Sequence, residues 1–120
     1  MGRRHQVKVS RVYDDSAKDD GARVLVDRIW PRGLSKEKAH LHEWCKEIAP
    51  STALRKWYNH DPGLFEEFGR RYRIELSEPA RAEVLVHLRE LTERGGLTLL
   101  TATKHADISE AAVLADLLWE

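Results

Sequence analysis

The segment that decides the fold is a nearly continuous apolar run, ARVLVDRIW, at residues 22–30. Such a run is typical of a strand that is covered on both faces, as in a parallel sheet. A second apolar run occupies residues 97–102, and a β-branched strand is predicted over residues 7–13. Because helical segments separate the strands, the sequence predicts an α/β fold, a single compact domain with a small, mainly parallel sheet and helices packed on it.

Helices are predicted from capping residues and from apolar spacing. One helix is expected to begin near Ser35 and to place Leu41, Trp44, Cys45 and Ile48 at helical spacing. Three further helices are expected to start at Ser51, at Asp61-Pro62 and at Ser77-Glu78-Pro79, and the last of these is expected to end at Gly95-Gly96. A final helix is expected around Ala111 and Leu118.

The chain has 120 residues, with 20 Lys and Arg against 20 Asp and Glu. This length suits one domain, which we predict over residues 7–119 after a flexible lead-in, residues 1–6. The charge balance disfavours a general nucleic-acid or membrane binder, since either would carry a basic surplus. No apolar run approaches the roughly 20 residues that a membrane helix needs. The single cysteine, Cys45, fits a reducing cytoplasm, which is the predicted location.

Cationic residues follow the ends of both strong strands. Arg28 and Arg32 follow the first, and Lys104 follows the second. Because ligands of parallel sheets bind beyond the carboxyl ends of the strands, we predict that these three residues hold a phosphate or a carboxylate. Trp30 is predicted to form an apolar wall of the same pocket. The alternative is that Arg28 pairs with Asp27 and that the other two cations face water.

A second candidate lies at His60, which precedes Asp61 and Pro62. A histidine can transfer protons near neutral pH, so His60 is the predicted catalytic residue. The alternative is that Asp61 caps a helix and that His60 only occupies the preceding turn. Arg55 and Arg71 are predicted to form a secondary basic rim of the pocket, and a solvated helix face is the alternative.

No metal site and no cofactor are predicted. The six histidines form no HExxH motif, and Cys45 has no cysteine partner. The chain contains no Walker loop, GxGxxG or GxSxG motif. Cys45 itself is expected to be a buried packing residue of the helix after Ser35, and not a nucleophile.

A family resemblance is carried by three segments, VLVDRIWPRGLSKE (24–37), LRKWYNHDP (54–62) and FGRRY (68–72). They closely resemble the domain-of-unknown-function 488 family (DUF488), YeaO-like branch, and the likeness runs from about Val7 to Leu118. It implies a compact α/β domain whose activity is not established. The characteristic polar residues of the family match at Arg28, Trp30, Arg32, Lys36, Arg55, Trp57, His60, Asp61, Arg71, Tyr72 and Lys104.

Two departures from the family pattern bear on catalysis. The family usually has Lys-Asp where this chain has Lys104-His105, and it often has His followed by Asn or Ser at Ile108-Ser109. If those positions are catalytic, this protein is impaired or uses His105 instead.

Together the patterns predict a domain that binds a small anionic molecule, either as a hydrolase or transferase or without turnover. The alternative is a non-catalytic interaction or regulatory domain in which Asp27–Arg28 and His60–Asp61 form a structural polar network.

Overall fold

The fold is built on a four-stranded parallel sheet, described over residues 7–119 of a computed structural model. The predicted lead-in, residues 1–6, lies outside the described residues. The strand order is β1-β4-β2-β3, with all neighbours parallel. The strands are β1 (Val7–Arg11), β2 (Ala22–Leu25), β3 (Glu43–Trp44) and β4 (Leu97–Thr101). The predicted α/β class with a small parallel sheet is confirmed.

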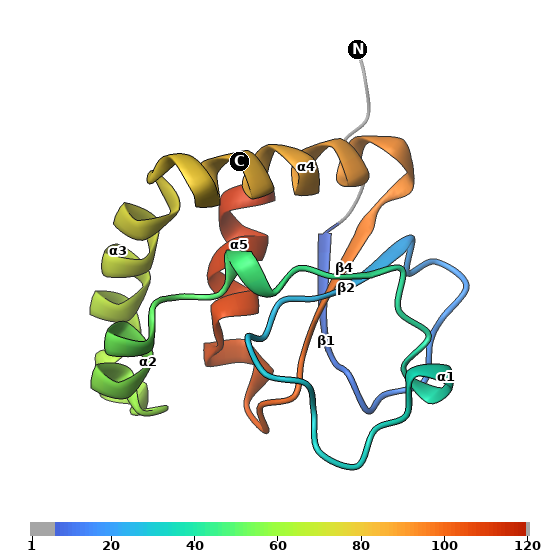
Figure 1. Cartoon of the computed structure of the whole chain (residues 1–120), viewed down its shortest axis with the longest axis horizontal. Helices are drawn as coiled ribbons and strands as arrows, with labels where there is room; N and C mark the ends of the chain where they lie inside the picture. Colours follow the sequence, from blue (N-terminus) through green and yellow to red (C-terminus); the bar gives the residue numbers. More distant parts are fainter. Residues whose placement is uncertain (1–6, 120) are drawn as a thin grey trace.

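Five α-helices and three 3-10 turns complete the described chain. The helices are α1 (Lys36–Ala39), α2 (Thr52–Tyr58), α3 (Phe65–Leu76), α4 (Pro79–Gly95) and α5 (Glu110–Trp119), and the 3-10 turns are η1 (Lys46–Ile48), η2 (Pro62–Leu64) and η3 (Ala106–Ile108). In Figure 1, α4 runs across the top, and α5 lies between α3 and the strands. None of the helices within residues 7–119 combines the length and the apolar character needed to cross a membrane.

The capping residues act as the sequence predicts. The Ser35 and Ser51 hydroxyl groups accept hydrogen bonds from the amides of Lys38 and Leu54. Asp61 accepts from the Gly63 amide, with Pro62 in the first turn, although that turn is 3-10 and leads into α3. Side-chain caps satisfy donors that the first turn leaves unpaired, so these starts can be predicted from local sequence.

The core follows the two-residue period of the strands. Val24 and Leu99 pack with the helices in the main core, whereas Leu25 and Leu100 belong to a smaller cluster with Trp44. All four aliphatic side chains are buried. The prediction of a strand covered on both faces is therefore confirmed for the first part of residues 22–30, where Val24 and Leu25 face the two clusters.

The helix predicted to begin near Ser35 and to run through Ile48 is wrong beyond its first turn. Helix α1 ends at Ala39 because His40 adopts a left-handed conformation, with φ 49°. The next residues form β3, in which Trp44 pairs with Leu25 of β2. The apolar residues that suggested one helix face belong to two clusters: Trp44 packs in the smaller cluster and Cys45 in the main core.

Strand β2 is shorter than predicted, and the shortening creates the candidate site. It ends at Leu25, although the Val26 amide still donates to the Leu100 carbonyl at 3.1 Å. At the next position the Asp27 carboxylate takes the place of a backbone carbonyl and accepts the Ala102 amide at 2.8 Å. The chain from Asp27 onward is therefore a loop at the carboxyl end of the sheet.

Candidate functional site

A pocket of about 740 Å³ lies beyond the carboxyl ends of β2 and β4. This volume is typical of a small-molecule site, and its position is the one that parallel sheets use for ligands. The loop after β2 supplies Arg28, Trp30 and Arg32, and α2 with the residues after it supplies Arg55 and His60. Five of the predicted site residues are thus brought to one pocket.

Asp27 holds the pocket loop to the end of β4. One carboxylate oxygen accepts the Thr101 hydroxyl at 2.8 Å, and the other accepts the Ala102 amide at 2.8 Å. Its backbone carbonyl accepts the indole N–H of Trp44 at 2.7 Å. Asp27 therefore bonds with β3 and the end of β4. It does not pair with Arg28, so that alternative is wrong.

Arg28 and Arg32 project from this loop into solvent. Both residues are exposed, and within residues 7–119 neither guanidinium group has an ion pair or a hydrogen bond. The Arg32 carbonyl accepts the Tyr13 hydroxyl at 3.2 Å, which fixes the backbone beneath the side chain. The two guanidinium groups can therefore bind an incoming anion without first breaking a contact with the protein.

Arg55 enters the pocket from α2. Its terminal nitrogen donates to the Thr52 hydroxyl at 3.2 Å, while its Nε atom is buried without a partner in the described part of the chain. A buried N–H group that lacks an acceptor costs free energy, and an anion in the pocket would supply one.

Trp30 forms part of the pocket wall. Its indole N–H donates to the Leu34 carbonyl at 2.8 Å, and its ring meets the Trp44 ring edge-on, with centroids 5.4 Å apart. Both contacts hold the indole in place. A fixed aromatic wall beside flexible cations suits a ligand with an anionic group on an apolar or planar body.

Glu110, the first residue of α5, also lines the pocket, and its Oε2 atom is buried without a partner among the described residues. Burial raises the pKa of Glu110 well above its ordinary value, and a hydrogen bond with Asp27 raises it further. The folded environment therefore favours the protonated, uncharged form of the Glu110 carboxyl group.

The raised pKa of Glu110 makes the stability of the fold depend on pH. In the unfolded chain this carboxyl group ionises near pH 4.3. Its contribution to the free energy of unfolding is complete below that pH. It is lost at up to about 1.4 kcal/mol per pH unit as the pH rises toward the folded-state pKa.

Glu110→Gln removes this titration while keeping an N–H donor toward Asp27. We expect the variant to gain stability over wild type between pH 5 and pH 8, measured by urea unfolding. The control, Glu66→Gln, removes an exposed carboxyl group of α3, and its difference from wild type should stay constant. A stability difference between Glu110→Gln and wild type that does not change with pH would contradict the assignment.

His60 lies at the pocket edge in a left-handed conformation, with φ 56°. Its Nδ1 atom is 3.4 Å from the Thr103 hydroxyl oxygen, and the residue is exposed. Asp61 does not orient the imidazole in this arrangement, since its Oδ1 atom accepts the Gly63 amide at 2.9 Å. A general base is normally oriented by a second group, and within residues 7–119 no carboxylate bonds this ring.

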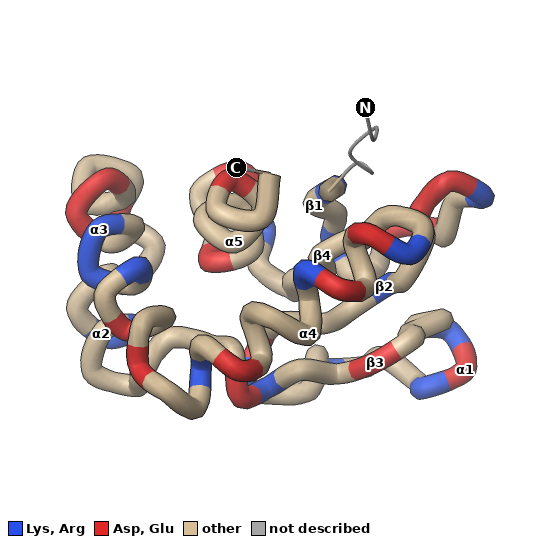
Figure 2. The backbone as a smooth tube through the Cα atoms, turned by 90° about the horizontal axis from the view of Figure 1, so that it is seen from above, with Lys and Arg blue, Asp and Glu red and all other residues tan. Residues whose placement is uncertain are grey.

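Lys104 and Arg71 do not line the pocket. Lys104 is exposed, one residue beyond the lining residue Thr103. The Arg71 Nε atom donates to Glu67 at 2.8 Å, and its guanidinium group lies 4.0 Å from the centre of the Trp57 ring. Figure 2 shows charges of both signs along α3, which is the solvated face given as the alternative to a basic rim.

Sequence reasoning missed several lining residues. Thr52 and Lys56 of α2, and Asn59 directly after it, line the pocket together with Arg55. Their spacing of three or four residues was a usable signal, because such positions share one helix face. Glu110 gave no local signal, since its burial depends on β4 and Asp27, which are distant in sequence.

Comparisons with known proteins give one consistent result. The model of a family described as the inactive DUF488-N3 subclade matches residues 6–120. An uncharacterised protein of Mycobacterium tuberculosis, Rv3073c, is 52% identical over 118 residues, which cover 98% of each chain. The uncharacterised Escherichia coli protein YeaO is 39% identical over 112 residues, 93% of this chain and 96% of YeaO. No solved structure matches.

Proposed function

Since the chain belongs to the inactive DUF488-N3 subclade, we propose that it is a non-catalytic domain that binds a small molecule bearing a phosphate or a carboxylate. The observation that carries this proposal is the cationic lining of the 740 Å³ pocket. Arg28 and Arg32 have no protein partner among the described residues, and Arg55 has a buried, unpartnered N–H group. Guanidinium groups bind both kinds of anion through paired hydrogen bonds.

The charge of the pocket supports the same proposal. Its lining includes four side chains that are cationic at neutral pH and two carboxyl groups, those of Asp27 and Glu110. The cationic side chains therefore outnumber the acids, and the raised pKa of Glu110 reduces the negative charge further. The Asp27 carboxylate is also occupied by donors from β4. An anion entering the pocket therefore meets a positive field.

Two observations favour binding over turnover. His60 has no carboxylate that orients it among the described residues, and Asp61 serves as a cap. The family description names the subclade inactive, and the chain has His105 and Ile108 where the family resemblance led us to expect Asp and His. The cationic side chains need neither of those groups in order to bind an anion.

The binding proposal is tested with the double variant Arg28→Ala/Arg32→Ala. Calorimetric titration of the full chain would use inorganic phosphate, phenyl phosphate, succinate and benzoate. Each lost charge-assisted contact is worth about 1.5–3 kcal/mol, so we expect affinity for the tightest of these anions to fall at least about tenfold. The double variant should melt near wild type, because the two arginines are exposed.

The matched control is Lys36→Ala/Lys104→Ala, which removes the same charge from residues outside the pocket lining. Equal weakening by both double variants would show a general charge effect and overturn the site. Absence of binding to all four anions would overturn the proposal itself. Turnover of phenyl phosphate that is lost in His60→Ala would contradict the non-catalytic part. A large loss of stability in Arg28→Ala would instead favour the structural network.

A further inference from the structure

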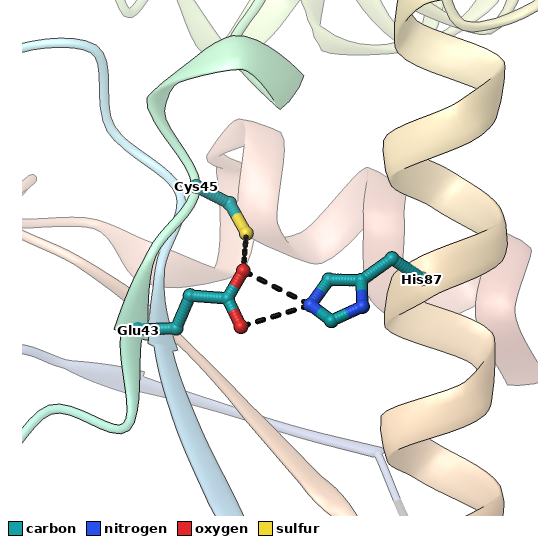
Figure 3. Close-up of side chains that lie close together, drawn as sticks. All are labelled: Glu43, Cys45 and His87. Atoms are coloured by element: carbon teal, nitrogen blue, oxygen red, sulfur yellow. Dashed lines mark hydrogen bonds and ion pairs between the residues drawn. The ribbon is translucent and has the colours of Figure 1, made fainter.

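Three side chains with metal-binding atoms meet on the helix-covered side of the sheet, away from the pocket. They are Glu43, Cys45 and His87, and their ligand atoms all lie within 4.8 Å of one another. Figure 3 shows the Glu43 carboxylate between the Cys45 sulfur and the imidazole. None of the three residues lines the 740 Å³ pocket, so the cluster is separate from the proposed anion site.

The local structure explains why these groups converge. Glu43 lies in β3 and Cys45 follows that strand directly. Their side chains meet on one face, while Trp44 packs in the smaller cluster. That shared face is covered by α4, whose His87 precedes the buried Leu88. Strand β3 and the residue after it thus supply two ligand atoms, and helix α4 supplies the third.

The three side chains are joined by hydrogen bonds to the Glu43 carboxylate. The Cys45 thiol donates to the Glu43 carboxylate, with sulfur and oxygen 2.9 Å apart. His87 Nε2 lies 2.8 and 3.0 Å from the two carboxylate oxygens. Tetrahedral zinc holds such atoms about 3.3–3.6 Å apart, so the two carboxylate pairs would have to open slightly, while the sulfur and the imidazole nitrogen already lie within 4.8 Å of each other.

We propose that Glu43, Cys45 and His87 bind Zn²⁺ through a carboxylate oxygen, the thiolate sulfur and Nε2, with water as the fourth ligand. Thiolate, imidazole and carboxylate together are typical ligands of zinc, whereas Mg²⁺ and Ca²⁺ prefer oxygen alone. His87 is exposed and Glu43 is half-buried, which leaves a path for the ion and for the water.

Binding forms a zinc–sulfur bond and releases the thiol proton to solvent, with no change of oxidation state. The ion would replace the hydrogen bonds from the thiol and the imidazole to the carboxylate. It would also join the two-residue strand β3 to α4, because its ligands come from both elements. Occupancy should therefore raise the melting temperature of the domain.

The proposal departs from the sequence prediction that no metal is held. That prediction rested on the absence of a cysteine partner and of a local histidine motif. His87 is 44 residues from Glu43 in the chain, so only the packing of α4 against β3 places it in the set.

The test uses the metal-free full chain and divalent metal alone. We expect Zn²⁺ to bind at one ion per chain, and Co²⁺ to give a thiolate-to-cobalt charge-transfer band, for which Cys45 is the only thiol. Cys45→Ser keeps a donor toward Glu43 but should abolish the band. His87→Gln should weaken Zn²⁺ affinity at least about tenfold, the order of loss seen when even an indirect ligand contact is removed.

His105→Gln is the matched control, because it removes another exposed histidine outside the cluster, and it should bind Zn²⁺ like wild type. A Co²⁺ complex without the thiolate band would overturn the proposal. Equal weakening by His87→Gln and His105→Gln would also overturn it, since general surface binding would then explain the affinity. If Cys45→Ser fails to fold, His87→Gln still decides, because His87 is exposed.

Discussion

Gly21→Ala is expected to lower the free energy of unfolding by about 2–5 kcal/mol, from left-handed strain together with steric overlap. Gly21 has φ 64°, and a Cβ atom there would overlap the carbonyl oxygen of Gly96 and lie 2.6 Å from its carbonyl carbon. The neighbouring Ala22 amide donates to that same carbonyl at 3.1 Å. Because the overlap is with backbone at the start of β4, no side-chain rotation can relieve it.

Gly33→Ala separates the two causes. Gly33 also has a positive φ, 73°, but no atom lies within 4 Å of the Cβ that alanine would add. Its cost should be only the left-handed strain, about 1–2 kcal/mol. Urea unfolding followed by circular dichroism measures both variants. Equal losses in Gly21→Ala and Gly33→Ala would show that the close approach to Gly96 contributes nothing.

Asp20→Asn is expected to cost about 3–5 kcal/mol, the usual loss when one partner of a buried ion pair is removed. Asp20 and Arg23 are buried, and the Arg23 guanidinium donates to the Asp20 carboxylate at 2.7 Å. Arg23 also donates to the carbonyls of His40 and Ala39. Since arginine stays protonated, Asp20→Asn would leave a buried cation without its carboxylate.

The pH dependence of this pair has a definite sign. Burial alone would raise the pKa of Asp20, but hydrogen bonds from the Ala17 amide, Lys8 and Arg23 outweigh it and hold the pKa well below its usual range. The stabilisation is therefore complete above about pH 4, where an unfolded aspartate is ionised. It is lost as the pH falls toward the folded-state pKa, so wild type should lose stability at low pH more steeply than Asp20→Asn.

Asp19→Asn is the matched control, and thermal unfolding at neutral pH compares the two variants. Asp19 also pairs with Lys8, at 3.0 Å, but its side chain is 78% exposed. Its melting temperature should stay near that of wild type, because exposed ion pairs contribute little. A loss in Asp20→Asn no larger than that in Asp19→Asn would show that burial of the pair does not matter. Because Arg23 contacts Ala39 and His40 instead of the pocket loop, the folded fraction of Asp20→Asn should still bind anions.

Much of the fold could be predicted because its signals are local. A side chain caps its own first turn at Ser35, Ser51 and Asp61, so those helix starts are visible in short segments. The helix predicted after Ala39 was wrong because apolar residues at helical spacing can also arise when successive residues of a non-helical segment enter two different clusters. Trp44 and Cys45 do so.

The candidate site was only partly predictable. The strand ends indicated Arg28, Trp30 and Arg32, because the carboxyl edge of a parallel sheet is its usual ligand edge. Lys104 was expected beside them, but the chain after Thr103 carries it away from the lining. The buried carboxyl group of Glu110 and the unpartnered Nε of Arg55 became visible only when α5 and α2 were placed against the strand ends.

By itself, the sequence determined a small parallel sheet, most of its helix starts and the edge at which cations gather, because strand periodicity and capping act over a few residues. The tertiary structure decided the strand β3, the raised pKa of Glu110 and the meeting of Glu43 and Cys45 with His87. Each of these depends on burial or contact between segments far apart in the chain. Such contacts are set by packing the whole domain, and no local pattern of residues records them.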